Sequence, residues 1–395
     1  MTTHRWAEAY PELGTEPIDL SSCVDDDVFQ REIDKVFTKT WLMVGREEEL
    51  PKPGDYKVRR LAFADTSAIM IRGKDDKIRA FHNICSHRGN KIVVERGVET
   101  YGGRRSGILS CRFHGWGFDS TGGLVHVPAE KKFYDCFDRT ENGLAPIHCD
   151  VWAGFVFINL AEKPAETLKE FLAEIGDIFG EFPFNAMPKR FAYSTELNCN
   201  WKIAVDAFAE AYHVDTIHGG TFPGAKSSFE DVRLFDKHRI AALCADFTLP
   251  PTPAAALSQK FIKASVTDTK KQTGLPKLMN PGRRNNFINE LSVIFPSLLM
   301  HVTTDIWFTH QFWPVSTDKT RWEGYYYLKE PKTHSEKWAI EHAQILQRNA
   351  WLEDTATMEA THQAIRSKAK RQFHLQDEEV LVRHGYTVLE KFLKS

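Results

Sequence analysis

The order of apolar and polar residues divides the chain into a strand-rich first part and a mixed second part. Between about 41 and 160, the short apolar runs DYKVRR, SAIMIRG and KIRAFHN are separated by polar turns, and GKDDK at 73–77 predicts a hairpin tip. The apolar run VWAGFVFINLA at 151–161 predicts one buried strand. Because few residues here follow helical spacing, we predict a small β domain.

Helical spacing begins after this domain. Residues 163–181 contain TLKEFLAEIGDIFG, in which apolar residues recur every three or four positions, so we expect an amphipathic helix. A strand is predicted at 190–198. The segment 200–218 contains no proline or glycine and predicts one helix that begins at Asn198 or Asn200.

The remaining sequence predicts a sheet and further helices. The stretch 246–286, with TLPPTP, DTKKQTG and NPGRR, is the least regular and is interpreted as a mobile loop or lid. NELSVIFPSLLMHV, DIWFTHQFWPV and RWEGYYYLKE are typical of antiparallel strands, and 335–365 and 377–393 are predicted helices. We therefore predict an α+β fold, with an all-β domain at 41–160 and a helix-covered antiparallel sheet built from 1–40 and 161–395.

Composition excludes several classes of protein. A chain of 395 residues exceeds the usual size of one hydrophobic core, which favours two domains. The net charge of -2 gives no reason to expect nucleic acid or a membrane surface as partner, and the longest apolar run is shorter than the roughly 20 residues of a membrane span. The N-terminal residues lack a signal-peptide pattern, and seven scattered cysteines argue against a secreted disulfide framework, so we expect a cytoplasmic protein.

The β domain carries two paired motifs with metal-binding residues. Cys85 and His87 lie two apart, Cys111 and His114 lie three apart, and a glycine follows each pair. A zinc knuckle also uses two cysteines and two histidines. The order of cysteine before histidine in both motifs, and the 23 residues that separate them, favour a Rieske centre, in which cysteines bind one iron and histidines the other.

A second group of candidate ligands lies in AEAYHVDTIH at 209–218. Glu210 and His213 share one face of a helix, whereas His213 and His218, five apart, point away from each other unless the helix ends between them. Two histidines and one carboxylate are the ligands of many non-haem Fe(II) oxygenases. The candidate carboxylates are Glu210, Asp206 and Asp215, or an acid in NAWLEDTATMEATHQ at 349–363.

Both motifs resemble those of the Rieske non-haem iron oxygenases, specifically the catalytic α subunit of aromatic ring-hydroxylating enzymes. The resemblance implies a Rieske [2Fe-2S] cluster on Cys85, His87, Cys111 and His114. It implies a mononuclear Fe(II) on His213, His218 and Asp354, with Glu353 and Glu359 as rivals of Asp354. The segment VETYGGRRSG at 98–107 is longer than usual for the family and is interpreted as a surface insertion.

In the family, an acid before the first histidine links the mononuclear site to the Rieske domain of a neighbouring subunit, and Glu210 takes this position. Most aromatic dioxygenases of the group have aspartate there, so the carboxylate of this chain reaches one methylene further. The resemblance further implies a homotrimer, with a β subunit left open, and electrons that come from NAD(P)H through a reductase, a ferredoxin or both.

The implied reaction is O2-dependent hydroxylation of an aromatic substrate, with cis-dihydroxylation as the main expectation. A monooxygenase or an O- or N-demethylase acting on a methoxy, N-methyl or alicyclic substrate is the first alternative. A non-catalytic electron carrier or zinc-stabilised binding protein is the second. The expected pocket is apolar and is lined by residues from the following set: Phe208, Val214, 219–290, Leu298, Met300, His301, Trp307, Phe308 and His310. Arg283 and Arg284 either anchor a substrate carboxylate or form a solvated pair.

Overall fold

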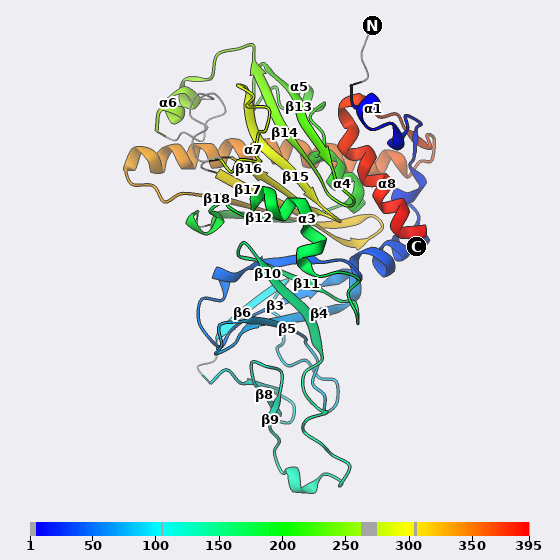
Figure 1. Cartoon of the computed structure of the whole chain (residues 1–395), viewed down its shortest axis with the longest axis vertical. Helices are drawn as coiled ribbons and strands as arrows, with labels where there is room; N and C mark the ends of the chain where they lie inside the picture. Colours follow the sequence, from blue (N-terminus) through cyan, green and yellow to red (C-terminus); the bar gives the residue numbers. More distant parts are fainter. Residues whose placement is uncertain (1–4, 104–105, 188, 262–274, 304–305, 395) are drawn as a thin grey trace. The chain divides into compact units, whose positions relative to one another are not determined.

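A computed structural model describes residues 5–103, 106–187, 189–261, 275–303 and 306–394 (Figure 1). The chain forms two compact units, one made of residues 33–171 and the other of residues 1–32 and 172–395. The predicted mixture of an all-β part and a helix-covered antiparallel sheet is confirmed. Within the described residues, no helix is long and apolar enough to cross a membrane.

The unit of residues 33–171 is built on an antiparallel sheet of seven strands in the order β2-β11-β10-β5-β4-β3-β6, beside a small sheet in the order β7-β8-β9. The strands are β2 (Leu42–Arg46), β3 (Asp55–Leu61), β4 (Thr66–Arg72), β5 (Ile78–His82), β6 (Glu99–Gly103), β7 (Leu109–Ser110), β8 (Gly117–Phe118), β9 (Leu124–His126), β10 (Pro146–Trp152) and β11 (Phe155–Asn159). The three runs predicted as strands on either side of the GKDDK turn are β3, β4 and β5. One apolar core holds Val58, Ile69 and Phe81 together with both motif cysteines, Cys85 and Cys111.

One prediction for this unit is wrong. The apolar run at 151–161 is not one strand, because Ala153 and Gly154 adopt positive φ angles of 48° and 82° and turn the chain from β10 into β11. The segment 98–107, predicted as a surface insertion, contributes β6, which pairs with β3 at the edge of the sheet. On β6, Glu99 Oε1 lies 2.7 Å from the ammonium of Lys57, so the segment neutralises a buried cation; residues 104–105 are outside the described residues.

The second unit is built on another antiparallel sheet of seven strands, in the order β12-β18-β17-β16-β15-β14-β13. Its strands are β12 (Lys189–Leu197), β13 (Ala225–Leu234), β14 (Arg239–Phe247), β15 (Phe287–Ile294), β16 (Leu298–Val302), β17 (Ile306–Ser316) and β18 (Lys319–Leu328), and β1 (Ile18–Asp19) pairs separately with β19 (Gln372–Phe373). The helices are α1 (Arg5–Ala9), α2 (Asp26–Glu32), α4 (Trp201–Phe208), α5 (Val214–Ile217), α6 (Pro253–Phe261), α7 (His334–Ile365) and α8 (Val380–Lys394), and α3 (Leu168–Phe179) spans the boundary between the units. In Figure 1, the long helix α7 crosses the sheet.

The predicted helix over 200–218 is broken in the structure. Asn200 caps its start by accepting a hydrogen bond from the backbone N–H of Lys202, but α4 ends at Phe208 and the short α5 begins only at Val214. Between them, the carboxylate of Glu210 accepts a hydrogen bond from the backbone N–H of His213 at 3.1 Å. A side chain therefore takes the place of the helical carbonyl acceptor, which allows the chain to change direction before His213.

The irregular stretch 246–286 is also more ordered than predicted. Strand β14 continues into it as far as Phe247, and Pro253–Phe261 forms α6. The DTKKQTG part of the predicted lid falls within 262–274 and lies outside the described residues.

Candidate metal centres and pocket

The two candidate histidines stand at the two ends of the short helix α5, His213 directly before it and His218 directly after it. Nε2 of His213 lies 3.5 Å and Nε2 of His218 lies 3.2 Å from Oδ1 of Asp354, which comes from the middle of α7. One ligand atom from each of the three residues lies within 4.8 Å of the others. The sequence analysis required a helix end between the two histidines if they were to bind one ion. Helix α5 ends at Ile217, so this condition is met.

The opposite nitrogen of each imidazole faces a glutamate. Nδ1 of His213 lies 2.5 Å from Glu210 Oε1, and Nδ1 of His218 lies 2.7 Å from Glu353 Oε2. Glu353 also accepts a hydrogen bond from the hydroxyl of Thr221 at 2.9 Å. A carboxylate on Nδ1 keeps the proton on that nitrogen and leaves the Nε2 lone pair free to bind a metal ion.

The electrostatics of this group favour a bound cation. Asp354 is only 3% exposed, and its Oδ1 is buried without a hydrogen-bond donor. Burial acts to lower the pKa of His218, but the carboxylates of Asp354 and Glu353 raise it above its ordinary value overall. The carboxylate oxygen is buried, has no hydrogen-bond donor and faces two imidazole nitrogens. A metal ion bound by these three atoms would satisfy the carboxylate.

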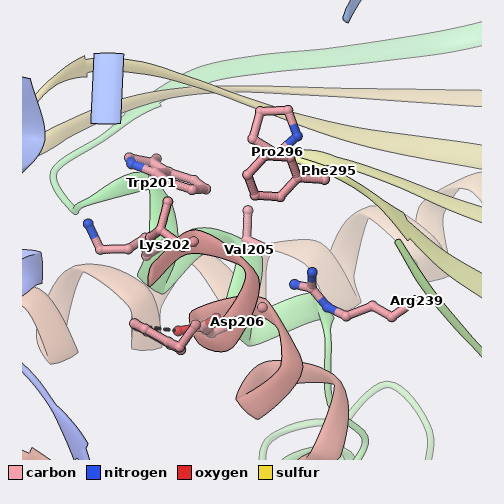
Figure 2. Close-up of a pocket in the computed structure, with 10 residues that line it drawn as sticks. Trp201, Lys202, Val205, Asp206, Arg239, Phe295 and Pro296 are labelled. Atoms are coloured by element: carbon pink, nitrogen blue, oxygen red, sulfur yellow. Dashed lines mark hydrogen bonds between the residues drawn. The ribbon is translucent and has the colours of Figure 1, made fainter. Parts of the chain in front are cut away.

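The other candidate acids have different partners. Glu359 accepts a hydrogen bond from the backbone of Asn198, and Asp215 pairs with Lys226. Asp206 lies beside a cavity of about 20 Å³ that Arg239 also lines, with the guanidinium directed toward it (Figure 2). None of these three carboxylates belongs to the group of His213, His218 and Asp354.

In the other unit, the two Cys/His loops meet. The thiols of Cys85 and Cys111 are close enough that each shifts the pKa of the other, and Nδ1 of His87 lies 3.1 Å from Nδ1 of His114. The cysteines are buried, whereas His114 is exposed. Sulfur atoms are thus paired on the inner side and imidazole nitrogens on the outer side, which is the pairing a Rieske centre requires.

Polar groups around Cys111 favour its thiolate, whereas burial raises the pKa of Cys85. Burial acts to raise the pKa of Cys111, but the backbone N–H of Phe113 and the amide of Asn90 outweigh it and lower the pKa overall. The amide of Asn90 lies 3.6 Å from the sulfur of Cys111. Trp116 stacks on His87 with ring centroids 4.9 Å apart and so covers one face of that imidazole.

A cavity of about 380 Å³ opens beside the group of His213, His218 and Asp354. Its floor is one face of the second sheet, because the residues that line it are paired across neighbouring strands: Phe229 with Leu243, Leu243 with Asn289, Leu291 with His301, His301 with Phe308, and Phe308 with Tyr326. Helix α7 forms the opposite wall through Trp351 and its neighbours. The described lining is mainly apolar and aromatic.

The predicted lining is correct for one face of the strands only. Phe208, Val214, His301, Phe308 and His310 line the cavity. Leu298, Met300 and Trp307 are not among its described lining residues, since alternate residues of a strand point to opposite faces. Arg283 and Arg284 are both exposed and outside this lining, and Arg284 pairs with Asp231 at 3.1 Å.

The sequence alone did not assign three contacts of these sites: Glu353 on His218, Asn90 on Cys111, and Asn289 on His301. Glu353 was considered only as a rival ligand. The available signal was that Glu353 directly precedes Asp354. Consecutive helical residues point in different directions, so if Asp354 is the ligand, Glu353 must contact another atom.

Each of the two units matches the model of a known protein family. Residues 184–395 match the family described as ring hydroxylating alpha subunit (catalytic domain), and residues 40–146 match the Rieske [2Fe-2S] domain. The chain belongs to the ring-hydroxylating α-subunit family. The predicted resemblance to the α subunit of Rieske oxygenases is therefore confirmed.

Similar proteins within this family include both monooxygenases and dioxygenases. The carnitine monooxygenase oxygenase subunit of Acinetobacter pittii is 31% identical over 196 residues, covering 49% of this chain and 50% of that protein. The benzene 1,2-dioxygenase subunit alpha of Pseudomonas putida is 30% identical over 210 residues, covering 50% of this chain and 43% of that protein. The chain thus aligns with about half the length of these curated relatives.

Solved structures of the family show the same fold. A quaternary ammonium Rieske monooxygenase superposes with a TM-score of 0.74 at 20% identity, covering 95% of both chains. Naphthalene 1,2-dioxygenase with indole bound in the active site superposes with a TM-score of 0.72 at 19% identity, covering 96% of this chain and 92% of that one.

A member of this Rieske oxygenase family carries a [2Fe-2S] Rieske cluster and a mononuclear iron. Both donor sets of this chain fit these groups. Two thiols and two imidazoles meet in the first unit, and two imidazoles with an unsatisfied buried carboxylate meet in the second.

Proposed function

We propose that the chain is the terminal oxygenase of a Rieske system that hydroxylates an aromatic substrate with O2, with cis-dihydroxylation as the reaction. The observation that carries this proposal is the convergence of His213, His218 and Asp354 within 4.8 Å at the wall of a mainly apolar cavity of about 380 Å³. Electrons come from NAD(P)H through a reductase, a ferredoxin or both. The assembly is a homotrimer, and a β subunit is compatible with it.

In this proposal, residues 41–160 form the cluster domain, and residues 1–40 with 161–395 form the catalytic domain. Cys85 and Cys111 hold one iron of the cluster, and His87 and His114 hold the other. The pairing of the two thiols and the 3.1 Å approach of the two imidazoles support this assignment.

The mononuclear iron is held by His213, His218 and Asp354, and when bound it supplies the activation of O2. Glu210 and Glu353 keep the proton of each imidazole on Nδ1, so that both Nε2 atoms remain available. Glu210 also serves as the link to the Rieske domain of a neighbouring subunit. Aromatic side chains such as Phe208 and Trp351 exclude water and orient a flat substrate against the metal site.

Monooxygenation or demethylation is the second candidate reaction. It is favoured by the 31% identity to the carnitine monooxygenase oxygenase subunit, whereas the likeness to benzene 1,2-dioxygenase subunit alpha, at 30%, supports ring dihydroxylation. The aromatic lining of the cavity supports the dioxygenase reading.

Metal and product analysis test these proposals. A working oxygenase contains about three irons per chain, two in the cluster and one in the catalytic domain, whereas an electron carrier lacks the mononuclear iron and a zinc protein lacks the Rieske signal. The reduced protein is then incubated with aromatic acids and polycyclic hydrocarbons under O2 labelled with heavy oxygen. Two labelled oxygens on adjacent ring carbons support dihydroxylation, and one or none on the retained product supports the alternative.

A further inference from the structure

Three polar side chains stand together in the middle of the cavity floor. Asn289, His301 and His310 come from β15, β16 and β17, the three central strands of the sheet. Strand register places them on one face, because His301 is paired with Leu291 and with Phe308, and Asn289 and His310 lie two residues from those partners. All three line the cavity, so the apolar floor has a polar centre.

The two imidazoles are held in fixed orientations. His301 stacks on Phe308 with ring centroids 4.4 Å apart, and His310 stacks on Phe208 at 4.0 Å. The two histidine rings lie edge to face, with centroids 5.4 Å apart. Aromatic neighbours on each ring limit its rotation, so its free nitrogen keeps one direction.

The hydrogen bonds of each imidazole define its tautomer. Trp322 Nε1–H donates to His310 Nδ1 at 3.1 Å, which assigns the proton of His310 to Nε2. Nδ1 of His301 lies 3.2 Å from the carbonyl oxygen of the Asn289 amide, which assigns the proton of His301 to Nδ1. One Nε2 is therefore a donor and the other an acceptor.

Neither Nε2 has a partner in the described structure. Both atoms are buried, and His301 and His310 are only 7% and 0% exposed. Burial lowers the pKa of His301 to about 3 and that of His310 well below its ordinary value, so both rings are uncharged at neutral pH. Buried polar groups are normally satisfied. An unused donor and an unused acceptor, on rings whose centroids lie 5.4 Å apart, therefore suit one ligand group that both accepts and donates.

Charge further restricts that ligand. Among the described residues that line the cavity there is no lysine and no arginine, and its carboxylates are Glu210 and Asp354 at the metal site. A substrate carboxylate at the cavity floor would be buried with no cationic side chain of the described lining beside it, which is strongly unfavourable. A hydroxyl group, in contrast, can accept from His310 and donate to His301 at once.

Building on the proposed function, we propose that His301 and His310 are the polar anchor of the substrate pocket, and that the substrate is an uncharged, largely apolar molecule with a hydroxyl group at this position. Asn289 is a positioning residue that sets the tautomer of His301. Because Trp351 contacts His310 at a centroid distance of 4.9 Å and lies one helical turn before Asp354, the anchor fixes which edge of the substrate faces the metal site.

Ligand binding without turnover tests this anchor. Dissociation constants of the purified full-length protein, kept oxidised and free of reductase, are measured for naphthalene, naphthol and naphthoate by quenching of tryptophan fluorescence. The three probes share one ring system and differ only at one substituent. We expect naphthol to bind at least about tenfold more tightly than naphthalene, and naphthoate more weakly than naphthol. Naphthoate binding as tightly as naphthol, or no preference for naphthol over naphthalene, overturns the proposal.

Substitutions assign the preference to the two histidines. His301→Phe and His310→Phe should each bring the affinity for naphthol down to that for naphthalene, while naphthalene binding is kept and reports an intact pocket. Ser258→Ala is the control, because Ser258 also lines the cavity but its hydroxyl already donates to the backbone carbonyl of Ala339 at 3.1 Å, so this variant should keep the preference. If a phenylalanine variant does not fold, Asn289→Leu keeps both imidazoles and should reduce the preference partly.

A preference for naphthol that survives all three floor substitutions contradicts the anchor. Binding is independent of O2 and reductant, so the anchor and the proposed function fail separately. Normal probe selectivity without hydroxylation would contradict the proposed function alone.

Discussion

The carboxylate of Glu353 lies 2.7 Å from Nδ1 of His218, on the opposite side of the ring from the neighbouring Asp354. Two consecutive acids of α7 therefore act on the two nitrogens of one imidazole. Glu210 contacts Nδ1 of His213 in the way that Glu353 contacts Nδ1 of His218. Each proposed histidine ligand therefore has its own carboxylate on the nitrogen that faces away from the metal site.

Glu353→Ala should weaken binding of the mononuclear iron by about 10- to 100-fold, because His218 loses the acceptor that fixes its tautomer and orientation. Competition with a chelator measures this affinity, and the absorbance of the Rieske cluster serves as an internal reference. Glu359→Ala is the matched control, since Glu359 lies on the same helix and binds Asn198 instead of a histidine. Equal iron affinity in the two variants would show that Glu353 does not position His218.

Asp354→Ala should remove the mononuclear iron and keep the cluster spectrum, because no other carboxylate in the described structure joins the two Nε2 atoms. The iron content should fall by about one per chain. Asp215→Ala, which removes a carboxylate paired with Lys226, should leave the iron content unchanged. Full iron content in Asp354→Ala would mean that the third ligand is assigned incorrectly.

Asn90→Ala should lower the reduction potential of the Rieske cluster, on the order of tens of millivolts, because hydrogen bonds to the sulfurs stabilise the reduced, more negative cluster. The amide of Asn90 lies 3.6 Å from Cys111 Sγ. A redox titration followed by absorbance measures the change. Ser86→Ala is the control, since the Ser86 hydroxyl donates to the carbonyl of Gly143 and not to a sulfur. An unchanged potential in Asn90→Ala would refute the role of this contact.

Asp206→Asn should make the stability of the protein less dependent on pH. Burial raises the pKa of Asp206 from 3.8 to about 7, against the opposing effects of the Tyr386 hydroxyl, Arg239 and Lys202, while the nearby Glu379 raises it further. Between these values the folded state keeps a proton that the unfolded chain releases, so the wild-type free energy of unfolding falls as pH rises, and levels off above about 7. Asp206 keeps part of its surface exposed, so the slope is at most about 1.4 kcal/mol per pH unit.

Urea unfolding at several pH values between 4 and 8 measures the free energy of unfolding of the wild type and of Asp206→Asn. The two pH dependences should differ by at most about 1.4 kcal/mol per pH unit. The variant should lose less stability than the wild type as pH rises. Asp177→Asn removes an exposed carboxylate of the same unit and should follow the wild type. Parallel curves for the wild type and Asp206→Asn would contradict the raised pKa.

The candidate metal-site residues could be singled out from the sequence because their types and spacing are chemically restrictive. Cys85, His87, Cys111 and His114 come from two short loops, so their meeting required little knowledge of the fold. The position of Asp354, 136 residues after His218, came from resemblance, because no local pattern shows that α7 brings Asp354 to within 3.2 Å of His218.

Other features depended on tertiary structure. The break after Phe208 arises from the hydrogen bond between Glu210 and the backbone of His213, while local helix propensity continues through the segment. The turn at Ala153 and Gly154 interrupts an apolar run that has no polar residue to mark it. The polar centre of the floor joins three strands, and register cannot be read from one strand alone.

The last prediction concerns the electron path and separates two roles of Glu210. Its Oε1 faces Nδ1 of His213 at 2.5 Å, and its Oε2 accepts from the His213 backbone N–H at 3.1 Å, yet each oxygen retains a second lone pair for a donor from another subunit. Glu210→Gln can still accept from His213 through its amide oxygen, so it should bind both metals, but it loses the charge and replaces one acceptor with a donor. We expect electron transfer from the reduced cluster to slow by about 10- to 100-fold. Glu210→Asp keeps the charge with a shorter reach and should retain much of the activity.

Single-turnover oxidation of the pre-reduced cluster by O2 in the presence of substrate, with iron content measured on the same samples, distinguishes these outcomes. Normal cluster oxidation in Glu210→Gln would remove the bridge, and loss of iron in that variant would show instead that Glu210 acts by positioning His213.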